Sequence, residues 1–119
     1  MDYSDLCQKV DFLGQNLVCV IVVKKGKLVA SKVKPGLEAL NEKRFADMFT
    51  QVQIMVGVAQ TAEDILGGME HVKVRYGNGL DVYLFPLETP SEKTILVVAV
   101  MRPYNTDDLL EKIVNVIRT

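Results

Sequence analysis

Two stretches of the chain consist of apolar residues without interruption, LVCVIVV (17–23) and ILVVAVM (95–101). A strand with one face in water alternates apolar and polar residues, whereas a short unbroken apolar run is typical of a strand buried on both faces. The two runs therefore predict central strands of a sheet that helices cover on both sides.

Two glycine turns predict hairpins. The turn KKGK (24–27) connects the first run to a returning strand, LVASKVK (28–34), which ends before a Pro-Gly pair. The turn GNG (77–79) connects a strand at 72–76 to another at 80–84, and apolar and polar residues alternate on both sides of it. Asparagine followed by glycine between alternating segments is a strong hairpin signal. These hairpins bring the predicted strands to five.

The first and last segments of the chain have apolar residues at helical spacing. In the first segment, Asp2 or Ser4 is the predicted N-cap and Gly14 the predicted stop. In the last segment, Asn105 or Thr106 is the predicted N-cap, and acidic residues follow where they complement the positive end of the helix dipole. We therefore expect a helix at each end of the chain.

The longest predicted element is a single helix from Glu42 to Leu66 or Gly67, with Asn41 as its N-cap. The apolar stripe expected to face the sheet comprises Phe45, Met48, Phe49, Val52, Met55, Val56, Ala59 and Leu66. A second stripe, made of Ile54, Val58 and Ile65, lies about 180–220° around the helix from Phe45. Because a helix that covers one sheet needs one apolar face, the second stripe predicts an additional partner.

The order of the predicted elements is helix, two strands, long helix, three strands and helix. Strands that are buried on both faces require helices on both sides of the sheet. The predicted fold is therefore α/β (α+β), a three-layer sandwich with a five-stranded antiparallel sheet, the long helix on one face and the terminal helices on the other. A chain of 119 residues without linkers or repeats is expected to form a single domain, residues 1–119.

Composition narrows the class of protein. The formal net charge is −1, which gives no general attraction to nucleic acid or to membranes. The longest apolar run is far shorter than the ~20 residues of a membrane span, and the polar N-terminal segment is unlike a secretory signal. Cys7 and Cys19 are too few for a disulfide framework and lack metal-ligand spacing. We expect a cytoplasmic protein without a membrane span.

The residues that most often carry catalysis all have a structural explanation in this sequence. His71 is the single histidine and lies on a predicted edge strand, as a solvated or interface side chain. Gly67 and Gly68 follow a helix, which indicates a C-cap instead of a phosphate-binding loop. Asp107 and Asp108 suit the start of the last helix. We expect no enzymatic activity, no cofactor and no metal.

One group of positive charges surrounds the first predicted hairpin: Lys24, Lys25, Lys27, Lys32 and Lys34. It allows two interpretations. The lysines are a patch for the phosphates of nucleic acid or anionic lipid, or they protect an edge strand against unwanted pairing. No aromatic residue is interleaved with the lysines, which argues against nucleic acid.

Four aromatic residues leave a further alternative open: Phe12, Tyr83, Phe85 and Tyr104. They line a small-ligand pocket between sheet and helix, as in a sensor module, or they simply pack in the core. No polar group in the pattern indicates what such a pocket would hold.

Four segments resemble the roadblock/dynein-light-chain (LC7-like) family. They are VIVVKKGKLVASK (20–32), LGGMEHVKV (66–74), LDVYLFPL (80–87) and ILVVAVMRPYNTDDLLEKI (95–113). The chain also resembles uncharacterised archaeal proteins of the same topology. The resemblance extends over most of the chain, and these four segments carry it.

The resemblance implies a function. Roadblock-type proteins are generally non-enzymatic dimers whose long helices pack together and whose third strands pair edge to edge, and many are platforms for small Ras-like GTPases or parts of larger complexes. It implies a homodimer contact through Phe49, Val52, Ile54, Val58, Val72, Val74 and Tyr76. His71, Lys73 and Arg75 would then lie near the two-fold axis and meet an acidic partner.

Overall fold

The computed structural model describes residues 2–34, 42–87 and 92–119. The elements are α1 (Tyr3–Asp11), β1 (Leu17–Lys24), β2 (Lys27–Val33), α2 (Glu42–Gln60), α3 (Glu63–Leu66), β3 (Val72–Arg75), β4 (Leu80–Leu87), β5 (Thr94–Met101) and α4 (Thr106–Arg118). This order agrees with the prediction except for α3, a short helix that follows the long one.

The five strands form one antiparallel sheet in the order β2-β1-β5-β4-β3. The two unbroken apolar runs are β1 and β5, which lie side by side at the centre of the sheet, as predicted. The strands β2 and β3 are the two edges. Among the described strands β3 has a neighbour on one side only, so no described strand pairs with its other side.

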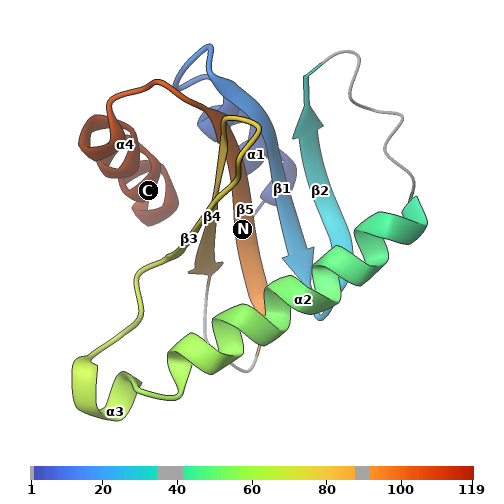
Figure 1. Ribbon diagram of the computed structural model, residues 1–119, viewed down its shortest axis with the longest axis vertical. Coiled ribbons are helices and arrows are strands. Elements are labelled where there is room, and N and C mark those ends of the chain that lie inside the picture. Colours follow the sequence, from blue (N-terminus) through green and yellow to red (C-terminus); the bar gives the residue numbers. More distant parts are fainter. Residues whose placement is uncertain (1, 35–41, 88–91) are drawn as a thin grey trace.

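Helices cover both faces of the sheet (Figure 1). On one face, residues of α1 and α4 share a core with β1, β4 and β5. On the other face, Phe49 and Val56 of α2 pack against Ile21, Leu84 and Val97 of the sheet. The three-layer arrangement is therefore confirmed, with the long helix alone in its layer.

The predicted caps are confirmed at both terminal helices. Asp2 and Asn105 each accept a hydrogen bond from the backbone amide three residues further along the chain, at 3.1 and 3.0 Å. The predicted end of the first helix is wrong. The helix α1 ends at Asp11 with Phe12 as C-cap, before Gly14, because the amide that follows Phe12 bonds to a carbonyl only three residues back.

The prediction of one long helix through residue 66 or 67 is also wrong. The helix α2 ends at Gln60, and both the hydroxyl and the amide of Thr61 donate to the carbonyl of Val58, at 2.7 and 3.2 Å. A threonine that bonds locally to a backbone carbonyl competes with the helical pattern, and here a turn results. Gly67 is the C-cap of α3, as predicted for a glycine after a helix, while the predicted cap Asn41 lies outside the described residues.

The first hairpin turns within KKGK (24–27), as predicted, and the structure shows a two-residue turn there. Lys25 and Gly26 both have positive φ, 52° and 78°, and Lys24 pairs with Lys27 across the hairpin. Positive φ at both central residues is the backbone of a type I′ turn, whose twist matches that of the flanking strands.

The packing of α4 gives a direct test of the layers. Ile113 is fully buried, so we expect Ile113→Ala to lower the free energy of unfolding by about 2–5 kcal/mol through lost burial and a residual cavity. Glu111→Ala, at an exposed position of the same helix, is the control and should change it by less than about 0.5 kcal/mol. Urea unfolding followed by circular dichroism measures both values. Equally small effects would contradict this placement of α4.

Candidate functional site

The edge strand β3 carries different chemistry on its two faces. Val72 and Val74 pair with residues of β4 that face α2, and Val72 packs against the core beneath that helix. His71, Lys73 and Arg75 are on the opposite face, which α4 covers. The alternation seen in the sequence therefore separates an apolar side from a basic side.

No described residue pairs with the backbone of β3 along its outer edge. The amide of Tyr76 donates to the carbonyl of Leu80 at 2.8 Å, and hydrogen-bonded pairs alternate along an antiparallel ladder. The N–H and C=O groups of Lys73 and Arg75 consequently point away from β4. An open row of donors and acceptors is a template for another strand.

Behind the basic side lies a buried carboxylate. Asp81 of β4 is only 2% exposed, and its two oxygens accept hydrogen bonds from Arg102 and from the hydroxyl of Tyr104, the latter at 2.6 Å. The charged groups of Lys73 and Arg75 lie further away, 3.8 and 3.6 Å from the same carboxylate. Asp81 thus accepts hydrogen bonds from one cation and one phenol, and two further cations lie within ion-pair distance of it.

These contacts determine the protonation of the cluster. Burial by itself would raise the pKa of Asp81, but the hydrogen bonds from Tyr104 and Arg102 and the positive charges of Arg102 and Lys73 outweigh it, so the pKa lies below its ordinary value. Burial and the hydrogen bonds with Asp81 and Tyr83 raise the pKa of Tyr104. At neutral pH the carboxylate is charged and the phenol is a donor.

Arg102 also holds the turn between β3 and β4. Its guanidinium donates to the carbonyls of Tyr76 and Leu80, at 2.7 and 3.1 Å, and its amide donates to the carbonyl of Gly79 at 2.9 Å. The open strand is thereby fixed to the end of β5.

The sequence analysis missed Asp81, Arg102 and the role of Tyr104. A signal was present in LDVYLFPL (80–87), because Asp81 shares its strand face with Tyr83 and Phe85, which are both buried. A charge on an apolar face needs a partner. The sequence gives no indication of which cation supplies it.

The face of α2 that points away from the sheet carries four exposed apolar side chains, with the exposed Gln51 among them. The four are Met48, Ile54, Met55 and Val58, with exposed fractions of 53, 53, 37 and 67%, and we call this face the outer face of α2. The placement of Met48 and Met55 on the sheet-facing stripe is wrong. They lie about 100–120° around the helix from Phe49, beyond the arc that meets the sheet.

The residues expected at a dimer contact are not equally accessible. Phe49 is 7% exposed and belongs to the core of its own chain, and Val52 and Val72 pack partly against that core. Val74 is half-buried. Ile54, Val58 and Tyr76 are exposed, and Tyr76 lies just past the end of β3.

The structure does not bring the five lysines together in one patch. Lys24 is paired with Glu92 at 3.4 Å, and the ammonium of Lys34 donates to the carbonyl of Gln15 at 2.8 Å. Lys27 and Lys34 are seven residues apart, or roughly 23 Å along an extended strand. Lys25, Lys27 and Lys32 are exposed.

The four aromatic residues do not share a pocket either. Tyr83 and Phe85 are buried with ring centroids 6.2 Å apart, and the ring of His71 lies within 5.7 Å of both. Tyr83 and Tyr104 share a hydrogen bond of 2.6 Å. Phe12, in contrast, is 88% exposed at the end of α1.

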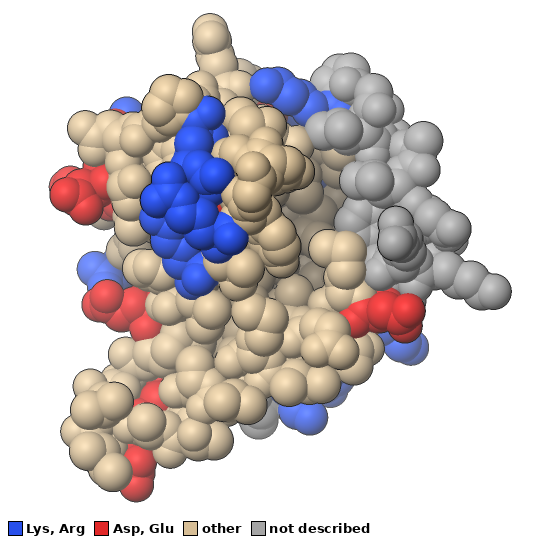
Figure 2. All heavy atoms as spheres, in the orientation of Figure 1, with Lys and Arg blue, Asp and Glu red and all other residues tan. Residues whose placement is uncertain are grey.

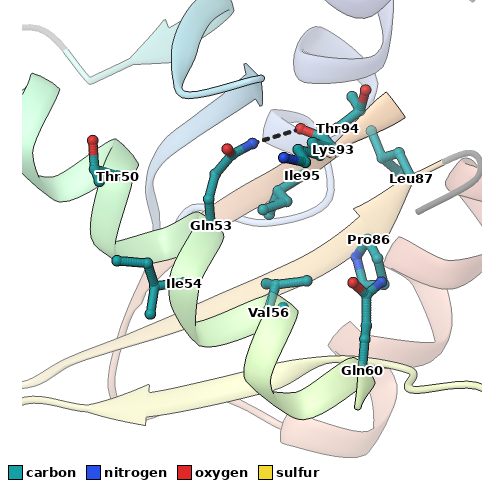
Figure 3. Close-up of a pocket in the computed structure, with 11 residues that line it drawn as sticks. Thr50, Gln53, Ile54, Val56, Gln60, Pro86, Leu87, Lys93, Thr94 and Ile95 are labelled. Carbon is teal, nitrogen blue, oxygen red and sulfur yellow. Dashed lines mark hydrogen bonds between the residues drawn. The ribbon is translucent and has the colours of Figure 1, made fainter. Parts of the chain in front are cut away.

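A cavity of about 350 Å³ lies between α2 and the ends of β4 and β5 (Figure 3). The side-chain amide of Gln53 reaches across it and donates to the carbonyl of Lys93 at 2.8 Å. Val56, Pro86 and Ile95 supply apolar walls. Its volume is at the lower end of the range of small-molecule sites.

The two cysteines are free thiols. Burial raises the pKa of Cys7 and of Cys19 to about 11, so both are protonated at neutral pH and are weak nucleophiles. In the part of the chain that the structure describes, no group of three or more histidine, cysteine or acidic residues is placed to hold a metal ion. Nor do the described segments include a helix long and apolar enough to cross a bilayer.

The lowered pKa of Asp81 predicts how stability depends on pH. A carboxyl group whose pKa is lower in the folded than in the unfolded state binds fewer protons when folded. It therefore stabilises the fold above the unfolded pKa, and this effect is lost as the pH falls through the folded pKa. The loss should begin near the ordinary value of 3.8 and continue below it.

Asp81→Asn tests this prediction. We expect its Tm to be lower than that of the wild type by at least about 5 °C at pH 7, with the difference shrinking as the pH is lowered toward about 2. Asp64→Asn, at an exposed position of α3, should shift the Tm at pH 7 by less than about 2 °C. A difference between wild type and Asp81→Asn that stays constant with pH would contradict the ionic role of Asp81.

No protein-family model and no curated protein matches the sequence. Solved structures do match its fold. The roadblock/LC7 domain from Streptomyces avermitilis superposes with a TM-score of 0.75 at 11% identity, over 99% of this chain and 93% of the other. MglB from Myxococcus xanthus superposes with a TM-score of 0.71 at 13% identity, over 99% of this chain and 93% of the other. MglC from the same organism superposes with a TM-score of 0.69 at 15% identity, over 99% of this chain and 95% of the other. The chain therefore has the roadblock/LC7 fold, as the resemblance of its sequence predicted.

Proposed function

We propose that the chain is a single roadblock-like domain, residues 1–119, that forms a homodimer and serves as a non-enzymatic platform for another protein. The observation that carries this proposal is the outer face of α2. It places four exposed apolar side chains around the exposed Gln51 on the helix that covers this side of the sheet, and the described part of the chain leaves all four in solvent. Such a surface on a small protein usually marks an interaction site.

The free energy gained by burying the outer face of α2 is marginal for a stable dimer, so a second contact surface is expected beside this helix. Full burial of a large apolar side chain contributes about 1.5–3 kcal/mol. Since the four side chains are only 37–67% exposed in one copy, burial of the exposed parts of all eight in two copies contributes on the order of 10 kcal/mol. The cost of association is about 4–15 kcal/mol, so the helix contact alone is marginal.

The open edge of β3 is the natural second surface. Val72 and Val74 face the same side of the sheet as α2, so a two-fold axis perpendicular to the sheet would bring both surfaces onto their copies at once. Pairing would also satisfy the outward backbone groups of Lys73 and Arg75. Another protein of this fold, described as MglB with a tetrameric arrangement, supports assembly between copies (14% identity, TM-score 0.62).

The partner that we propose is a small Ras-like GTPase or a larger complex that contains one, on the strength of the family resemblance in the sequence. The thiols of Cys7 and Cys19 are free, which suits the cytoplasm, where we place the protein. His71, Lys73 and Arg75 remain our candidates for contact with an acidic partner. We do not propose nucleic-acid or membrane binding, because the lysines of the first hairpin are spread from the end of β1 to just past the end of β2.

A ligand sensor is the second candidate, and the cavity between α2 and the sheet is the observation that favours it. The side chains of Gln53 and Gln60 and the hydroxyl of Thr94 give it polar groups beside an apolar wall. A metabolite that binds there would raise the Tm of the protein.

The dimer can be tested by substitution on the outer face of α2. We expect the wild type to have twice the 13.3 kDa chain mass by light scattering, and Ile54→Asp with Val58→Asp to be monomeric, because charges on this face would be buried without partners. Phe12→Asp, at a side chain that is 88% exposed just past the end of α1, is the control and should remain dimeric. Unchanged circular dichroism confirms that each variant folds.

A wild type that is monomeric at every concentration would contradict the dimer and favour the ligand sensor. A dimer that survives both α2 substitutions would show that the contact uses another surface.

GTPase binding is tested directly by calorimetry with Ras-like GTPases of the source organism, loaded with GDP or with a non-hydrolysable GTP analogue. A platform that reads the nucleotide state should bind the two forms with affinities that differ by at least about tenfold, or about 1.4 kcal/mol. Absence of binding to either form of every GTPase tested would contradict this part of the proposal.

A further inference from the structure

Positive charges outnumber negative charges at the β3 edge. Lys73, Arg75 and Arg102 surround the single carboxylate of Asp81, a local excess of two positive charges. The four residues line a shallow pocket of about 330 Å³ together with Tyr104 and Thr106. Figure 2 shows the corresponding patch of Lys and Arg side chains over the β3 side of the sheet.

Two of the cations have hydrogen-bonding capacity left. The oxygens of Asp81 are taken by Arg102 and Tyr104, whereas Lys73 and Arg75 approach only to 3.8 and 3.6 Å, beyond hydrogen-bond distance. Within the described part of the chain, no other acceptor bonds to their side chains. Their donors are available to an anion in the pocket.

The surroundings reinforce the positive potential only in part. The pocket reaches Thr106, the first residue of α4, where the helix dipole is positive. Of the two acidic residues that follow, Asp108 is paired with Lys112 at 2.9 Å, and Asp107 is exposed. The excess charge at β3 therefore has no further acidic partner among the ion pairs of the described residues.

Pairing of two β3 strands would double this excess. A two-fold axis perpendicular to the sheet places residues of the same face opposite each other. If the pairing is centred on Val74, Lys73 lies across from Arg75 of the second copy. If it is centred on Lys73, the two copies of Lys73 lie across from each other. Directly opposed like charges destabilise a strand pair. The junction would hold six cations and two carboxylates, an excess of four positive charges.

We infer that the two-fold junction of the β3 strands binds an oxyanion with two or more negative charges, a phosphate or carboxylate compound, and that this anion strengthens the dimer. The inference rests on the proposed homodimer. The guanidinium of Arg75 suits planar or tetrahedral oxyanions, and the ammonium of Lys73 adds a point charge beside it. The strand β3 would thus supply both the backbone groups that pair the two copies and the side chains, Lys73 and Arg75, that make this pairing depend on an anion.

Sedimentation equilibrium at constant ionic strength, with chloride as the balancing anion, tests the inference. The probes are inorganic pyrophosphate, a nucleoside diphosphate and citrate. An anion that binds only the dimer, present at ten times its dissociation constant, should tighten dimerisation about tenfold. Equal effects of pyrophosphate and the nucleoside diphosphate indicate a site that binds the phosphate groups alone. A larger effect of the nucleotide indicates a nucleotide ligand. A larger effect of citrate indicates a carboxylate ligand.

The variants separate a site from general screening. Lys73→Gln with Arg75→Gln should dimerise more tightly than the wild type without a probe, because the repulsion is gone, and should not respond to the probes. Arg75→Gln alone, at a side chain that is 65% exposed, gives an intermediate response if the double variant folds poorly. Lys27→Gln with Lys32→Gln on the opposite sheet edge is the control and should respond like the wild type.

The outcomes distinguish failure of the anion site from failure of the homodimer. A dimer that responds to pyrophosphate and citrate no more than to chloride, or a double variant that responds like the wild type, overturns the anion site and leaves the dimer standing. A chain that is monomeric in every buffer overturns both. A chain that dimerises only when a probe is present supports both.

Discussion

The structure depends on a sheet whose central strands are apolar on both faces. Because β1 and β5 expose no polar face, the sheet is stable only between two layers of helices, and the chain supplies them unequally. Two helices, α1 and α4, share one face, while α2 covers the other alone. A lone helix buries one of its sides, so the apolar residues on the opposite side of α2 remain exposed. The surface that we assign to a second copy is thus a consequence of how the fold distributes its helices.

The buried carboxylate links this fold to its open edge. Asp81 orients Arg102 and Tyr104, and Arg102 in turn holds the turn between β3 and β4. The strand that offers free backbone groups is therefore held in place from the side opposite α2. Apolar side chains and charges lie on different faces of β3. In the proposed dimer the valines would favour association, and Lys73 and Arg75 would oppose it until an anion is bound. The residues that hold the proposed dimer together and those that make it respond to an anion would lie on the same four-residue strand, β3.

Much of the fold could be predicted from the sequence, because burial leaves a local pattern. Unbroken apolar runs indicated β1 and β5, and the glycine turns indicated both hairpins. The break after Gln60 could not be predicted in this way, since it depends on a side-chain bond of Thr61 that leaves no periodic trace. The site was predicted only in part. Lys73 and Arg75 follow from strand alternation, but the pairing of Asp81 with Arg102 joins residues 21 positions apart and needs the tertiary structure.

The central claim is that β3 pairs with β3 of a second copy, and amide hydrogen exchange tests it most directly. The backbone amides of Lys73 and Arg75 point outward from the sheet and would be hydrogen-bonded only in the dimer. We predict that these two amides are protected at protein concentrations where the dimer predominates and exchange rapidly after dilution to the monomer, while the amide of Val74, which faces β4, stays protected in both. Rapid exchange of Lys73 and Arg75 in a protein whose mass is that of a dimer would contradict the account.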